Sequence, residues 1–177
     1  MKIGIVRHFE VSQAYPSQWV GKEEVLRWFA DYDRADIVVK EVDLGRTAWD
    51  ICYSSDTIRA IRTAREIYKG DIVETSRLRE IPLPPFSGNL KLPFLWWAVV
   101  VRLQQLTTPT GREQMEHARR RIRSLLDQVT GEEQHRGVLF VSHGSLMKEM
   151  RNELRKRGYR GPRFSFPENG KLYVFEK

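Results

Sequence analysis

Short runs rich in Ile and Val alternate along this chain with segments whose apolar residues follow helical spacing. Residues 2–6 and 138–141 are the clearest strands. Three further runs predict strands, at residues 51–53, 72–74 and 171–176. Such alternation favours an α/β fold, a three-layer sandwich with a mostly parallel central sheet flanked by helices. At 177 residues, without a visible linker, we expect a single domain spanning 1–177.

Helices are expected between these strands. Apolar spacing predicts them at residues 17–32, 94–106, 110–129 and 144–156. Ser54, Ser55 and Asp56 are good N-cap residues for a helix to about Tyr68. Thr110 and Glu113 have the spacing of a capping box. Residues 81–93 hold four prolines and should be irregular, and residues 37–39 fit either a strand or a loop.

His8 and His143 each stand directly after one of the two clearest strands. In a parallel sheet both would lie at the carboxyl ends of strands, where ligands of open α/β sheets bind. One such histidine is more often structural, but two in matched positions favour function. Arg7 precedes His8, and Arg59 follows a third strand. Since guanidinium groups clamp phosphoryl oxygens, we expect these side chains to gather in one anion-binding cavity.

Charge and cysteine content bear on the binding partners and the cellular compartment to be expected. Lys and Arg number 30 against 23 Asp and Glu, a net charge of +7 that favours anionic partners. Cys52 is the one cysteine, so we expect no internal disulfide and a cytoplasmic protein. The apolar start is too short for a signal peptide, and residues 92–101 reach only about half a membrane span. We expect no membrane association.

Four motifs in order resemble those of the histidine phosphatases, also called the phosphoglycerate mutase-like superfamily. That family has an Arg-His pair after its first strand, a Ser-Ser-x-x-x-Arg-Ala-x-x-Thr-Ala segment, Leu-x-Glu, and a strand ending in Ser-His-Gly. Here these stand as Arg7-His8, residues 54–64, Leu78-Arg79-Glu80 and Ser142-His143-Gly144. The eleven-residue segment matches in full.

The resemblance implies a role for each residue. His8 would be the nucleophile that becomes phosphohistidine, while its other ring nitrogen is held as a donor. Arg7, Arg59 and His143 would bind the transferring phosphoryl group. Glu80 would act first as general acid and then as base. This chemistry implies no metal and no cofactor, and the sequence has no Walker-type loop.

The sequence departs from the family pattern after the first histidine. Phe9 replaces a glycine, which usually allows an unusual φ or a close approach to phosphate. Val11 stands where the family often has Ser or Thr, and no Asn occurs before Asn89. Ser12 or Gln13 are candidates to compensate. These departures raise the alternative of a catalytically impaired member that binds a phospho-ligand or a protein.

Three questions remain open at this stage. A mutase usually needs a longer chain, so we favour a phosphatase that acts on a phosphorylated small molecule or a phosphoprotein, phosphohistidine included. The segment 94–106, with Trp96 and Trp97, either covers the site and favours a hydrophobic substrate or simply packs on the sheet. Basic clusters such as Arg119-Arg120-Arg121 suggest nucleic-acid binding, but interleaved acidic residues argue against a specific interface.

Overall fold

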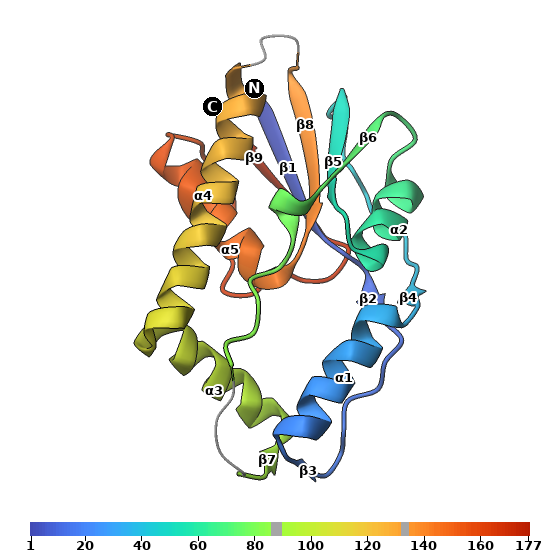
Figure 1. The fold of residues 1–177 in the computed structure, drawn as a ribbon. Coiled ribbons are helices and arrows are strands. Elements are labelled where there is room, and N and C mark those ends of the chain that lie inside the picture. The colour runs from blue at the N-terminus through green and yellow to red at the C-terminus, as the bar shows by residue number, and fades with distance from the viewer. Residues whose placement is uncertain (86–89, 132–134) are drawn as a thin grey trace.

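The structure, a computed structural model, describes residues 1–85, 90–131 and 135–177 (Figure 1). Its central sheet has five strands in the order β6-β5-β8-β1-β9. Four of them run parallel, and β9 pairs antiparallel with β1 at one edge. The strands are β1 (Lys2–Arg7), β5 (Ile51–Ser55), β6 (Ile72–Thr75), β8 (Gly137–Ser142) and β9 (Leu172–Glu176). The expected α/β fold with a mostly parallel sheet is confirmed.

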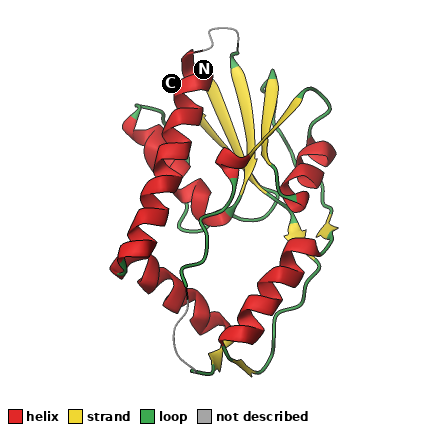
Figure 2. Cartoon of the chain, in the orientation of Figure 1, coloured by secondary structure: helices red, strands yellow, loops and turns green. Residues whose placement is uncertain are grey.

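Helices cover both faces of this sheet (Figure 2). On one face α2 (Ile58–Ile67) packs Ala60 and Ala64 against Leu139 and Val141 of β8. On the other face α4 (Pro109–Gly131) and α5 (Gly144–Lys156) pack on the alternate residues of the same strands. Because β1 and β8 are buried on both faces, residues 3–6 and 138–141 are apolar in succession rather than alternating.

The parallel register brings three strand ends to one edge of the sheet. Arg7 of β1 lies opposite Ser142 of β8, and Ser54 of β5 lies opposite Val141. The residues that follow these strands therefore start from neighbouring positions. This edge is where the sequence predicted ligand binding.

A second, smaller apolar cluster lies away from the sheet. It joins α1 (Lys22–Arg34) to α3 (Phe94–Thr107) through Val25, Trp97 and partly buried neighbours. The short strands β3 (Trp19–Val20) and β7 (Leu92–Pro93) pair there. Figure 1 shows α1, β3, β7 and α3 forming the end of the molecule beyond the sheet. The remaining short elements are the paired β2 (Glu10–Val11) and β4 (Ile37–Val38), and η1 (Ser76–Leu78).

The helix expected at residues 17–32 begins later. Trp19 and Val20 are extended because they pair with β7, so α1 starts at Lys22. The Glu24 carboxylate accepts the Gly21 N–H in front of that helix. Residues 37–39 include the short strand β4, as one of the two expectations had it.

Two predicted helix starts are wrong. Ser54 and Ser55 belong to β5, so Thr57 rather than residues 54–56 caps α2. The helix predicted from Thr110 begins at Pro109, with proline in the first-turn position that suits it. Thr108 Oγ accepts the Gly111 N–H at 3.0 Å, in place of the expected Thr110 and Glu113 pair.

Most of the proline-rich segment follows the prediction. Residues 81–85 carry no helix or strand, and the segment ends in β7. Asn89 lies outside the described residues, as do Glu132 and Glu133, two of the acidic residues that interleave with the basic clusters.

Candidate active site

His8 stands at the end of β1 with its ring orientation fixed by the main chain. Its N–H donates to the Ser142 carbonyl at 2.9 Å, and its ring Nδ1 lies 2.6 Å from the Phe9 carbonyl. A carbonyl oxygen can only accept, so Nδ1 carries the proton. Nε2, which keeps its lone pair, is therefore the nucleophilic atom of this imidazole.

The surroundings keep His8 neutral. Its side chain is 3% exposed. Burial, then the positive charge of Arg59 and that of Arg7, lower the pKa of His8 to about 3, while its bond to the Phe9 carbonyl opposes the shift. At neutral pH the imidazole is therefore neutral, with its proton on Nδ1, and its free Nε2 is able to attack phosphorus.

His143 faces His8 from the end of β8, where it caps α5. The two ring centroids are 5.1 Å apart. Nε2 of His143 lies 2.9 Å from Ser55 Oγ, and an Arg59 N–H lies 3.4 Å from Nδ1. Since the guanidinium can only donate, Nδ1 accepts and Nε2 carries the proton. Burial, then the neighbouring His8 and Arg59, hold the pKa of His143 well below its usual range.

Two guanidinium groups supply the positive charge. Arg59 is 8% exposed and binds Asp33 Oδ1 through Nη1 at 2.6 Å. Arg7 donates to the Pro167 carbonyl at 3.1 Å and lies over the Phe166 ring. Among the described residues, the buried Nε atoms of both arginines have no hydrogen-bond partner. Two unsatisfied, charged donors beside two imidazoles favour a bound oxyanion.

Glu80 lies at the N-terminus of α5, the helix that His143 caps. Its carboxylate accepts the N–H groups of Ser145 and Leu146 at 2.9 Å each, and that of Ile81 at 2.8 Å. A carboxylate at a helix N-terminus satisfies otherwise unpaired donors and complements the helix dipole. Main-chain N–H groups therefore hold the Glu80 carboxylate in place. Two of them belong to Ser145 and Leu146, which follow His143 closely in the chain.

A family model of the histidine phosphatase superfamily (branch 1) matches residues 34–176. The chain belongs to the histidine phosphatase superfamily. The matched region contains Arg59, Glu80 and His143, and the fold adds Arg7 and His8 from β1 to the same edge of the sheet. No curated protein matches this chain in sequence.

Solved structures share the fold of this chain at low sequence identity. A candidate alpha-ribazole-5'-P phosphatase of Escherichia coli has a TM-score of 0.60 at 14% identity, covering 98% of this chain and 89% of its own. Phosphoserine phosphatase of Entamoeba histolytica has a TM-score of 0.56 at 17% identity, covering 99% and 90%. A mycobacterial glucosyl-3-phosphoglycerate phosphatase bound to VO3 has a TM-score of 0.56 at 17% identity, covering 98% and 91%.

Phe9 is accommodated without a positive φ, a conformation that only glycines adopt among the described residues. Its ring is fully buried, and its N–H donates to Thr63 Oγ at 2.9 Å. The Phe9 ring lies against Gly170, where an added Cβ would meet it at 2.7 Å. Thr63 in turn donates to the Arg59 carbonyl at 2.7 Å. The Phe9 N–H, rather than its side chain, therefore ties the main chain next to His8 to helix α2.

Sequence reasoning missed several groups around the site. Thr57, Ser55 and Thr63 lie within the matching segment 54–64, which was a signal that could have found them. Asn169, whose side chain donates to the His8 carbonyl at 2.8 Å, had no such signal. Ser12, expected to compensate in the phosphate shell, instead bonds the Asp36 carbonyl through its N–H and its hydroxyl.

The last turn of α1 lies against His8 and Arg59. The Tyr32 ring lies 6.4 Å from the His8 ring, and the Arg59 guanidinium lies 5.3 Å from the Tyr32 centroid. Asp33, the next residue, forms the ion pair with Arg59. Tyr32 and Asp33 therefore close over groups that a phosphoryl group would contact.

Within the described ranges, no three His, Cys, Asp or Glu side chains gather in an arrangement that would hold a metal ion. The helices described contain no segment with the length and apolar character needed to span a bilayer.

Proposed function

We propose that this chain is a phosphatase that hydrolyses a phosphomonoester or phosphohistidine through a covalent intermediate on His8. The observation that carries the proposal is the neutral His8 ring, whose Nδ1 is engaged by the Phe9 carbonyl, beside His143 and Arg59. Family membership supports phosphoryl transfer in general. The choice of hydrolysis rests on the length of the chain, which leaves little room for the lid insertions of a mutase.

In the first step, His8 Nε2 attacks phosphorus, the N–P bond forms and the bond to the leaving oxygen breaks. The leaving oxygen takes up a proton as it departs. Arg7 and Arg59 donate to the peripheral oxygens, whose charge is spread in the transition state. His143 would join them by turning its Nε2 N–H from Ser55 Oγ to the phosphoryl group. In the second step water attacks phosphorus and gives a proton to the base, the N–P bond breaks, and inorganic phosphate leaves neutral His8 behind.

Glu80 is the proposed proton donor and later the base. Its position beside His143 at the start of α5 supports this role. Its carboxylate accepts three main-chain N–H groups. Glu80 would therefore have to give up at least one of these bonds in order to exchange a proton with the substrate.

A second candidate function is binding of a phospho-ligand without turnover. The Asp33 carboxylate already neutralises Arg59, and Tyr32 lies over His8. A form held in this state would present His8 poorly to a phosphorus atom. This alternative predicts that the protein binds anions and that replacing His8 leaves any hydrolysis unchanged.

Hydrolysis of p-nitrophenyl phosphate by the wild type and His8→Ala tests the proposal. Removal of a covalent nucleophile should lower kcat by a factor of about a thousand or more. His117→Ala is the matched control, because His117 is an exposed histidine on α4. Equal activity in the wild type and His8→Ala would support the binding alternative instead.

A further inference from the structure

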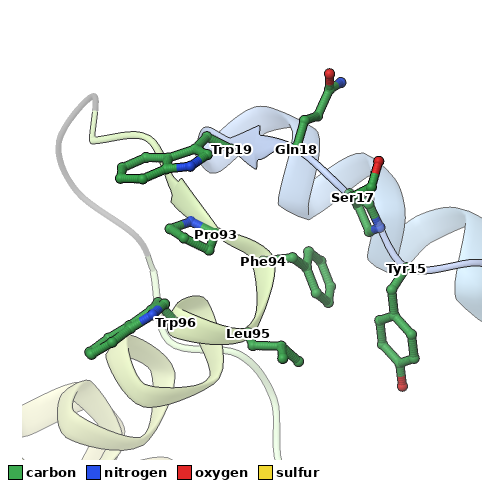
Figure 3. A pocket seen from close by; sticks show the side chains of 9 residues that line it. Tyr15, Ser17, Gln18, Trp19, Pro93, Phe94, Leu95 and Trp96 are labelled. Atoms are coloured by element: carbon green, nitrogen blue, oxygen red, sulfur yellow. The ribbon is translucent and has the colours of Figure 1, made fainter.

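A hollow of about 390 Å³ opens between residues 15–19 and residues 93–96. The Tyr15 and Phe94 rings contact each other at 5.6 Å between centroids, and Figure 3 shows Trp19 and Trp96 further along the lining. Sites for small organic ligands usually measure about 300–1,000 Å³, so the hollow has the size of a small-molecule subsite.

The lining selects a neutral, apolar group. None of the described residues that form the hollow carries a charged side chain. Aromatic rings and Leu95 provide most of the wall, and Ser17 and Gln18 provide its polar side chains. Leu95, Trp19 and Trp96 are 74%, 65% and 61% exposed, so a ligand seated here would remove much apolar surface from water.

A chain of ring contacts joins this hollow to the catalytic histidine. His8 contacts Tyr32 at 6.4 Å between centroids, and Tyr32 contacts Trp28 at 5.0 Å. Trp28 contacts both Tyr15 at 5.3 Å and Phe94 at 4.6 Å, and these two rings line the hollow. Trp28 and Tyr32 lie one helical turn apart on the same face of α1. The three ring-to-ring steps together come to no more than about 17 Å, so the Tyr15 and Phe94 rings lie within that distance of His8.

We propose that the hollow is the subsite for the body of the substrate, which is a phosphomonoester with an elongated, neutral apolar chain or ring system. The inference rests on the proposed function, because His8 and Arg59 would hold the phosphoryl end. A compact, charged metabolite such as a sugar acid phosphate would leave the hollow empty and gain nothing from it.

A chain-length series tests the proposal. We would measure kcat/KM for butyl, octyl and dodecyl phosphate, each below its micelle concentration, with phenyl phosphate as a short reference. Each methylene that enters an apolar site adds about 0.8 kcal/mol, or up to about fourfold. We expect kcat/KM to rise at least tenfold from the butyl to the dodecyl ester.

The variants Trp19→Ala and Trp96→Ala should remove most of this rise while leaving phenyl phosphate turnover unchanged. Leu103→Ala is the matched control, because Leu103 is an exposed apolar residue of α3 outside the hollow. It should leave the series as in the wild type. Far-ultraviolet circular dichroism would verify that each variant folds.

The outcomes separate the two proposals. Turnover of phenyl phosphate with no gain for longer chains would overturn the subsite while leaving the phosphatase proposal intact. No turnover of any ester, or turnover independent of His8, would overturn the proposed function itself. A change of sedimentation in Trp19→Ala, with an unchanged chain-length series, would assign the hollow to contact between copies and overturn the subsite.

Discussion

Asp33→Asn should tighten the binding of oxyanions at the catalytic site. The Asp33 carboxylate lies 2.6 Å from Nη1 of Arg59, the guanidinium that is also next to His143. A phosphoryl oxygen and this carboxylate compete for the same donor. Removing the negative charge frees Arg59 for the anion, while asparagine keeps nearly the same size.

The magnitude follows from the exposure of the pair. Asp33 has 66% of its side chain exposed, whereas Arg59 has 9%. Solvent screens an ion pair of this kind, so its worth is about 0.4–1 kcal/mol. In Asp33→Asn, an anion no longer has to break this ion pair in order to bind. The dissociation constant of the anion should therefore fall about two- to fivefold.

The assay is competitive inhibition by orthovanadate, a phosphate mimic, at fixed ionic strength. Asp36→Asn is the matched control, because Asp36 pairs with Arg62, whose side chain is 52% exposed. That variant loses the same charge close by and should bind vanadate as the wild type does. Unchanged or weaker inhibition of Asp33→Asn, or equal tightening in both variants, would refute competition at Arg59.

Three further predictions concern the support of the site. Thr63→Val leaves the buried Phe9 N–H unpaired and should lower stability by about 1–3 kcal/mol in urea denaturation, whereas Thr63→Ser should retain it. Glu80→Ala removes the acceptor of three main-chain N–H groups and should lower the free energy of unfolding by about 1–2 kcal/mol. Glu80→Gln should lower it less, and a fall of kcat by a hundredfold or more in that variant would assign proton transfer to Glu80. Since the pKa of His8 is lowered from 6.5 to about 3, the unfolded chain takes up a proton first as pH falls below 6.5. Stability should then decline by up to about 1.4 kcal/mol per pH unit toward pH 3, and His8→Asn should show a smaller decline between pH 7 and 4.

The sheet and its catalytic edge could be predicted because local signals agree with the tertiary fold. Residues of β1 and β8 are apolar on both faces, as strands of a covered parallel sheet must be. The matching segment 54–64 supplies Ser55, Arg59 and Thr63 in one strand-to-helix turn. His8 and His143 follow strands that turn out to be neighbours.

The parts that escaped prediction depend on contacts between distant segments. Trp19 and Val20 carry helical spacing, yet their pairing with Leu92 and Pro93 makes them extended. The Asp33–Arg59 ion pair joins residues far apart in sequence, and no local pattern encodes it. The 94–106 segment does not pack on the sheet as one alternative had it: Trp97 is buried in the separate cluster with Val20 and Val25, and Trp96 lines the hollow.

Trapping the covalent intermediate tests the central claim most directly. The wild type would be quenched during turnover without acid, because phosphohistidine is acid-labile. Peptide mass spectrometry under alkaline conditions should then locate a phosphoryl group on His8. His8→Ala should carry none. A phosphoryl group on another residue, or full turnover by His8→Ala without any labelled intermediate, would contradict the account.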